Sequence, residues 1–209
     1  MNATDRNEAV ADARERLLAR AKREGLTAVG YDVLDSPVGP LWVAIGPEGV
    51  ASIHFGREPS EAELRRLVRV FGPGIVPDRK RTSALDRELD QYFEGRRKAF
   101  QIPVDLRGIT PFQLRVLRAT SRLPYGEVAT YASIAKRAGN DRASRATGAA
   151  VGSNPIPIVV PCHRVIASDG TLGGYGGGLE MKRRLLALER GQVPPGGWLK
   201  ATQSATMGG

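Results

Sequence analysis

The feature that most constrains the fold is a change in the spacing of apolar residues along the 209-residue chain. Between Ala28 and Phe55 lie three short, mostly apolar runs, separated by Gly/Pro turns at 36–40 and 46–49, and in the first run Val29, Tyr31 and Val33 alternate with smaller or polar residues. This period of two predicts a β-meander, whereas the wider spacing after Thr110 predicts helices. We therefore expect an α+β fold with two domains: a small N-terminal domain of meander and helices, and a mainly helical C-terminal domain with a helix-turn-helix.

Four segments follow from these patterns, with boundaries where Gly and Pro cluster or where the periodicity ends. We expect a helical extension at 1–26, an N-terminal α+β domain at 27–108, a C-terminal domain at 109–192 and a flexible tail at 193–209. The meander strands are expected around Val29, Tyr31 and Val33, at 41–45 and at 50–55.

Residues that commonly cap helices predict where the helices begin. Ser60 is expected to cap a helix over 59–71, and Ser83 is expected to cap a second. Residues 100–106 resemble an edge strand, since Pro103 lacks the N–H that a central strand needs. The C-terminal domain is expected to hold four helices, which begin at Thr110 with Pro111 and then cover 127–138, 141–151 and 179–190.

Cys162 is the only cysteine in the chain, and it follows a run stiffened by three prolines. A thiol is nucleophilic only as the thiolate, and the adjacent His163 is a base that can help to remove its proton. A buried, inert cysteine is the alternative. A single cysteine excludes an internal disulfide and a Cys-rich zinc site, and the chain has only two histidines, so we expect no metal and no other cofactor.

The net charge of +9 favours a polyanionic partner, because each neutralised phosphate releases counterions. A basic surface that only aids solubility is the alternative. The chain shows no signal peptide and no apolar run long enough to cross a membrane. We therefore expect a cytoplasmic protein without a membrane partner.

The helices at 127–138 and 141–151 are separated by a short turn at Gly139-Asn140, which is helix-turn-helix spacing. The second helix consists mostly of small residues, with Arg142 and Arg145 projecting from it. Small residues let a helix approach a groove closely, and arginine can contact phosphates or enter the duplex. A close-packed interior helix with two surface arginines is the alternative.

A glycine-rich loop at 173–178 follows the cysteine stretch. It lacks the Lys-Ser/Thr ending of a phosphate-binding P-loop. We interpret it as a backbone wall that lets a flat ligand come close, with Tyr175 as a stacking partner or lid.

The stretch Pro161-Cys162-His163-Arg164-Val165, preceded by Asn154-Pro155 and followed by the Tyr175 loop, resembles the active-site signature of the O6-alkylguanine-DNA alkyltransferases, also called methylated-DNA–protein-cysteine methyltransferases. The resemblance covers residues 111–190 and fits residues 36–41 more loosely. It implies DNA repair in one irreversible turnover, in which a methyl or alkyl group moves from O6 of guanine, secondarily O4 of thymine, to Cys162. Minor-groove binding and flipping of the damaged nucleotide would come first.

The resemblance also implies roles for single residues. Cys162 would accept the alkyl group, and His163 would remove the thiol proton through a water. Glu189 would orient the histidine, as the third group does in other activated nucleophiles. Asn154 would fix the turn before the cysteine. Tyr131 would press on the target phosphate and donate a proton toward N3 of the leaving guanine.

The implied partner is double-stranded DNA containing O6-alkylguanine, bound by a monomer, with cooperative binding left open. Arg145 would enter the stack in place of the flipped nucleotide. The other expected DNA contacts are Tyr131, Arg142, Ala143 and Thr130. The expected guanine pocket consists of Val165, Tyr175, Gly176, Gly177 and Pro157.

The sequence departs from the family pattern at two points, and two other functions are alternatives to alkyl transfer. The chain lacks the zinc ligands that some family members carry in the N-terminal domain, and position 176 is Gly where many have Ser. A lesion-binding protein that only recruits repair factors would need the groove helix but no reactive thiol. A cysteine hydrolase would use the same Cys-His-Glu relay, formed by Cys162, His163 and Glu189, on a substrate other than DNA.

Overall fold

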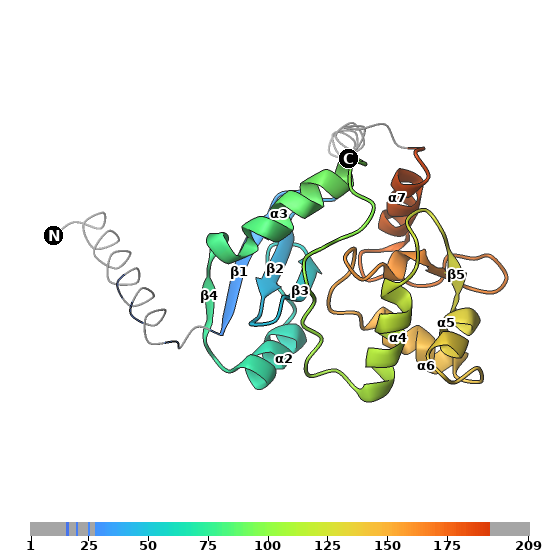
Figure 1. Ribbon diagram of the computed structural model, residues 1–209, viewed down its shortest axis with the longest axis horizontal. Helices are drawn as coiled ribbons and strands as arrows, with labels where there is room; N and C mark the ends of the chain where they lie inside the picture. The colour runs from blue at the N-terminus through green and yellow to red at the C-terminus, as the bar shows by residue number, and fades with distance from the viewer. Residues whose placement is uncertain (1–15, 17–19, 21–24, 26–27, 193–209) are drawn as a thin grey trace, which may run out of the picture.

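The computed structural model describes residues 16, 20, 25 and 28–192. The predicted extension at 1–26 and tail at 193–209 therefore lie outside the described residues, apart from those three positions. In chain order the elements are β1 (Val29–Leu34), β2 (Leu41–Ile45), β3 (Val50–Phe55), α2 (Glu61–Phe71), β4 (Ile75–Pro77), α3 (Arg79–Phe93), α4 (Pro111–Ser121), β5 (Ala129–Thr130), α5 (Tyr131–Arg137), α6 (Ser144–Gly152), the 3₁₀ turn η1 (Cys162–Arg164), β6 (Val165–Ile166) and α7 (Leu179–Glu189). They form a mixed α+β fold with an N-terminal sheet region and a C-terminal helical region (Figure 1).

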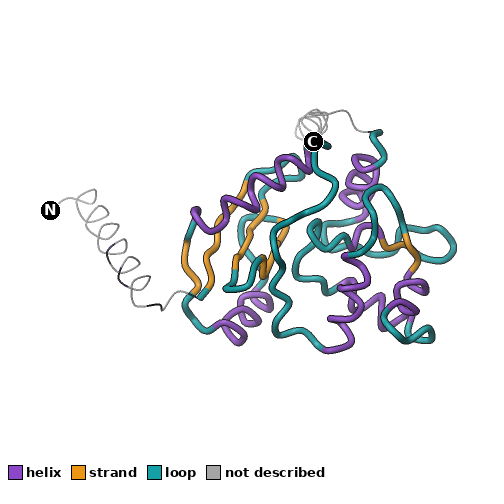
Figure 2. The backbone as a smooth tube through the Cα atoms, in the orientation of Figure 1, coloured by secondary structure: helices purple, strands orange, loops and turns teal. Residues whose placement is uncertain are grey.

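A four-stranded sheet in the order β3-β2-β1-β4 forms the N-terminal domain (Figure 2). β2 pairs antiparallel with both β1 and β3, which confirms the predicted meander. β4 is a strand that the sequence did not predict, and it joins β1 in parallel at the edge, with Gly30 opposite Val76. Its three residues lie inside a Gly/Pro-rich stretch and are too few to show an alternating pattern.

Both faces of β2 are covered, and all five of its residues are buried. Trp42 and Ala44 pack with Leu67 of α2. The alternate residues, such as Val43, pack with Leu85 of α3 and with apolar residues of the C-terminal domain. The sheet is therefore held between α2 on one face and α3 on the other.

Two predictions in the N-terminal domain need correction. Ser60 caps α2 as predicted, since its Oγ accepts from Glu63 N at 3.2 Å. Ser83 does not begin a helix: Asp78 caps α3, and Ser83 lies inside that helix. The first turn of α3 is mostly charged, so apolar spacing could not reveal it. Residues 100–106 form no strand and make only one isolated bridge, between Val104 and Val50.

Helix α4 begins as predicted, with Thr110 capping it through Gln113 N. The predicted helix at 127–138 is helical only from Tyr131, because Ala129 and Thr130 form β5. This strand pairs in parallel with β6, another two-residue strand that the sequence did not predict. Asp141 does not cap α6: residues 141–143 form a turn and the helix begins at Ser144.

The two domains share one large apolar core. Its buried members include Leu89 and Tyr92 from α3, Ile158 from the loop before η1, and Leu185 and Leu188 from α7. Residues 94–110 run along the boundary between the domains and connect α3 to α4 (Figure 1). None of the helices in the described part of the chain is long and apolar enough to cross a membrane.

Candidate active site

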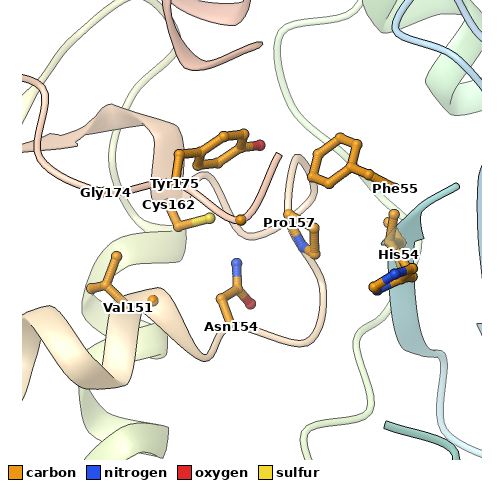
Figure 3. A pocket seen from close by; sticks show the side chains of 11 residues that line it. His54, Phe55, Val151, Asn154, Pro157, Cys162, Gly174 and Tyr175 are labelled. Carbon is orange, nitrogen blue, oxygen red and sulfur yellow. The ribbon is translucent and has the colours of Figure 1, made fainter. Parts of the chain in front are cut away.

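Cys162 begins η1 and lines a cavity of about 260 Å³ between the two domains. Its sulfur points into the space bounded by Tyr175, Pro157 and Asn154 (Figure 3). The C-terminal domain supplies Val151, Gly152, Asn154, Pro157, Cys162, Gly174, Tyr175 and Gly176, and β3 supplies Ile53, His54 and Phe55. Cys162 is 6% exposed, so a substrate reaches its sulfur through this cavity.

The loop before Cys162 is held in a tight conformation. Asn154 Nδ2 donates to Val160 O at 2.9 Å, and Asn154 Oδ1 accepts from Ile156 N at 3.1 Å. Ile158, fully buried, has φ +74°, a left-handed conformation that β-branched residues rarely adopt and that costs about 1–3 kcal/mol. The two Asn154 bonds close the loop around this residue, and the role of Asn154 in fixing the turn stays a prediction.

Glu189, the last residue of α7, holds the histidine. His163 Nε2 lies 2.8 Å from Glu189 Oε1, and both side chains are fully buried. Arg164 donates to both carboxylate oxygens, from Nε and Nη2, each at 2.8 Å. Tyr92 of α3 donates its hydroxyl to Oε1 at 2.8 Å, and Gly126 N donates to Oε2 at 3.0 Å. The carboxylate is therefore saturated by donors from both domains.

These contacts determine the protonation of the relay. Burial alone would raise the pKa of Glu189, but the hydrogen bonds and charges of His163 and Arg164 outweigh burial and lower the pKa from 4.5 to about 2. Burial lowers the pKa of His163, against the opposing effect of Glu189. At neutral pH the pair is thus a carboxylate and a neutral imidazole. The carboxylate can only accept, so Nε2 carries the proton and Nδ1 is left as an acceptor.

His163 Nδ1 is buried and makes no hydrogen bond to any described residue. Burial raises the pKa of the Cys162 thiol from 9.0 to about 11, against a hydrogen bond from Asn154 and the charge of Lys182. At pH 7 only about one thiol in ten thousand is then ionised. The sulfur at rest is a thiol, and a base is needed to activate it.

Lys182 is a fully buried cation next to this thiol. Its Nζ donates to the carbonyls of Val165 at 2.6 Å and Leu172, so it ties η1 to the loop that leads to the glycine wall. Burial lowers the pKa of Lys182 to about 8, against the opposing effect of Cys162. The ammonium therefore favours ionisation of the thiol and fixes the loop at the same time.

The glycine-rich loop forms one wall of the cavity. Tyr175 and Gly176 line it, and the Tyr175 hydroxyl is buried without a partner among the described residues. A Cβ at Gly176 would meet nothing within 4 Å, whereas one at Gly177 would lie 3.0 Å from the Phe55 ring. Gly177 is therefore part of the packing behind the wall. Val165 is fully buried and does not line the cavity, and its N–H already donates to Cys162 O.

The predicted DNA contacts lie on and around α5 and α6. Thr130 caps α5, accepting from Ser133 N at 3.1 Å. Tyr131 begins α5, and a Cβ at Gly173 would lie 2.8 Å from its hydroxyl, so Tyr131 packs against the glycine-rich loop. Arg142 and Arg145 are exposed, the first in the turn before α6 and the second in its first turn, and Ala143 stands at the N-cap between them. None of these residues lines the cavity.

Sequence reasoning missed several residues of the site. Lys182 and Glu189 lie on the same stripe of α7 as the buried Leu185 and Leu186, so two charges on an apolar face were a signal that could have found Lys182. Arg164 stood within the quoted motif but without a role. Tyr92 and the β3 residues had no local signal, because only the folding of the two domains brings them to the site.

A thiol in a cavity, beside a neutral histidine that is fixed by a carboxylate and can take its proton, is suited to attack on an electrophilic carbon once the thiolate forms. Two family models match the chain: the 6-O-methylguanine DNA methyltransferase ribonuclease-like domain over residues 29–106, and the DNA-binding domain of the same enzymes over residues 111–191. The chain belongs to the methylated-DNA–protein-cysteine methyltransferase family, whose members are methyltransferases that repair DNA by alkyl transfer.

The chain is similar to its relatives over most of their length. The methylated-DNA–protein-cysteine methyltransferase of Mycolicibacterium paratuberculosis is 43% identical over 79% of this chain and 95% of its own. The inducible enzyme of Bacillus subtilis is 42% identical over 72% of this chain and 84% of its own. A crystal structure of Mycobacterium tuberculosis OGT in complex with DNA superposes with a TM-score of 0.70, at 39% identity, over 82% of this chain and 99% of its own.

Proposed function

We propose that this chain repairs O6-alkylguanine in duplex DNA by moving the alkyl group irreversibly to Cys162. The observation that carries the proposal is the arrangement at Cys162: a thiol at a cavity, next to a histidine whose Nε2 is held by Glu189 and whose Nδ1 is free to accept. The cavity of about 260 Å³ suits a single flat base.

In the proposed reaction, the Cys162 proton passes to His163 Nδ1 through a water, and Glu189 stabilises the imidazolium that forms. The sulfur attacks the alkyl carbon, and the bond from that carbon to O6 breaks. The electron pair stays on the guanine, which takes up a proton. Tyr131 is the proposed donor of that proton, toward N3. The thioether that results is stable, so each molecule acts once.

Entry of guanine requires the nucleotide to leave the stack, because O6 of a stacked base cannot reach the sulfur of a residue that is 6% exposed. Arg145 is the proposed residue that takes its place, while Thr130, Tyr131, Arg142 and Ala143 contact the backbone. Pro157, Tyr175 and Gly176 would enclose the base, and the unpartnered Tyr175 hydroxyl is a ready hydrogen-bond group for it. The backbones of Val165 and Gly177 would support the wall from behind. O4-alkylthymine is a proposed secondary substrate, and the protein is proposed to act as a monomer.

The test is the mass of the intact protein after incubation with equimolar duplex containing O6-methylguanine. We expect a gain of one methyl group, located on Cys162, and no gain in Cys162→Ala, which should still bind the duplex. Binding without any gain in the wild type would favour a lesion-binding protein. Repeated turnover of a small ester after methylation of Cys162 would favour a hydrolase.

Replacement of Arg145 tests the flipping step. Arg145→Ala should slow transfer from duplex DNA, by about 10-fold or more if unstacking is worth a few kcal/mol, and should affect transfer from free O6-benzylguanine much less. Arg142→Ala, in the neighbouring turn, is the matched control and should weaken DNA binding without that selectivity. Equal transfer rates in duplex DNA for wild type and Arg145→Ala would exclude the role.

A further inference from the structure

A second basic surface lies outside the catalytic cavity, in a hollow of about 410 Å³ between α4 and α5. Four arginines and one alanine line it: Arg115, Arg118, Ala119, Arg122 and Arg137. We call this hollow the arginine groove. No carboxylate lines it, and all four arginines are exposed.

Three of the four arginines come from α4 and its C-cap, and the fourth, Arg137, ends α5. Arg115 and Arg118 lie on α4 and Arg122 is its C-cap; spacings of three and four residues put them on one face, and Ala119 between them forms a small, buried floor. Arg115 Nε donates to Ala138 O at 3.1 Å, and its guanidinium lies 5.6 Å from the Phe112 ring centre. Arg115 is therefore held in place and joins the end of α5 to α4.

The groove has no internal counter-charge. Among the described residues, no carboxylate lies within ion-pairing distance of Arg118, Arg122 or Arg137. Residues 111–152 contain seven Lys or Arg and two acids, a net +5 of the chain's +9. Like charges three and four apart weaken a helix slightly, so helix stability does not explain this stripe.

The side chains that line the arginine groove indicate which kind of ligand it binds. Guanidinium groups bind phosphate oxygens in pairs, while the groove offers no aromatic face on which a base could stack. A phosphodiester backbone therefore fits better than a free nucleotide. The Cα atoms of Arg115 and Arg122 lie roughly 10 Å apart along α4 and its cap, which is long enough to contact more than one phosphate of a strand.

The groove is separate from the region around the catalytic cavity. It shares no lining residue with that cavity, and Arg137 ends α5 whereas Tyr131, which packs against the glycine-rich loop, begins it. We propose that the arginine groove binds the phosphodiester backbone of DNA outside the portion that α6 holds, so that the protein grips its DNA in two places. The inference rests on DNA binding by this domain and not on the transfer chemistry.

The test compares the full-length wild type with Arg118→Ala/Arg122→Ala and with a control pair, Arg79→Ala/Arg87→Ala, which removes two exposed charges from α3. Affinity for undamaged duplex is measured by fluorescence anisotropy as a function of salt. For a long duplex, we expect the slope of log affinity against log salt to be shallower by about 2 in the groove variant and unchanged in the control. Between about 50 and 200 mM salt, the wild type should lose about ten-fold more affinity than the groove variant.

All three proteins should bind with equal affinity to a short duplex that contacts α6 but does not extend to the arginine groove. Arg137→Ala, on the other helix, should reduce the slope on the long duplex by about 1. An unchanged slope, the same change in the control pair, or equal losses on short and long duplexes would overturn the proposal. Methylation of Cys162 at saturating DNA should be normal in the groove variant. A wild type that gains no methyl would count against the transfer chemistry and leave the groove result unaffected.

Discussion

The two domains differ in how they contribute to the site. The C-terminal domain supplies the thiol, the histidine, the carboxylate and the glycine-rich wall, nearly all within short recognisable motifs. The N-terminal domain has no such motif, yet Tyr92 reaches the relay and β3 supplies part of the cavity wall. The C-terminal domain thus supplies the reactive groups and most of the contacts that hold them, while the N-terminal domain adds one hydrogen-bond donor and part of the cavity wall.

The largest effect should come from the C-terminal side of this comparison. Glu189→Gln removes the charge that orients His163 and leaves Arg164 buried without its carboxylate. We expect the single-turnover rate to fall at least about 10²-fold and the free energy of unfolding to fall by about 3 kcal/mol. Rapid-quench kinetics and urea unfolding measure the two quantities. Glu180→Gln, exposed in the first turn of the same helix, should change neither.

A smaller effect should come from the N-terminal side. Tyr92→Phe removes one donor from Glu189 Oε1. We expect the transfer rate to fall about 3- to 10-fold at neutral pH, as the loss of one hydrogen bond suggests. With one donor fewer, Glu189 should hold the His163 proton more strongly. The pKa of His163 should therefore rise, and the acid limb of the pH–rate profile should move to higher pH.

Tyr125→Phe is the matched control, because the Tyr125 ring lies 6.1 Å from that of Tyr92 but no hydrogen bond joins its hydroxyl to Glu189. It should leave the profile in place. A Tyr92→Phe protein that loses stability but keeps the wild-type acid limb would assign Tyr92 to packing alone. The two domains would then be independent in chemistry.

The smallest effect concerns the cavity wall. Phe55 packs edge-on against Tyr175, with ring centres 5.8 Å apart, and both line the cavity. Phe55→Leu should change the rate of methyl transfer less than about 3-fold and should raise the rate for benzyl relative to methyl lesions, because it shortens one wall. Competition between the two lesions in one reaction measures that ratio. An unchanged ratio would show that β3 does not limit the size of the alkyl group.

The same contrast explains what the sequence could and could not predict. The strands at 41–45 and 50–55 were predicted with the bounds they have, because short apolar runs bounded by Gly/Pro turns are a local signal. Cys162, His163 and Glu189 came from motifs, and the structure brings them together. β4, β5 and β6 are two or three residues long, too short for a period to show.

Long-range contacts and pKa values lay beyond the sequence for a different reason. Tyr92 and Glu189 are 97 positions apart, so no spacing rule connects them. The start of α3 was misplaced because Ser83 is as good a capping residue by type as Asp78. The start of α6 was misplaced because Asp141 is a capping residue by type, whereas the actual N-cap, Ala143, makes no side-chain cap bond. A histidine beside a cysteine suggested easy ionisation, but burial, which only the fold determines, raises the pKa of the thiol to about 11.

The short parallel pair of β5 and β6 has a mechanical consequence. Ala129, two residues before Tyr131, is opposite Val165, which directly follows the η1 turn of Cys162. Helix α5 and Cys162 are thereby linked through the backbone pairing of one short sheet. In the proposed reaction, the sulfur therefore keeps its position relative to α5, and the part that moves in each encounter is the nucleotide.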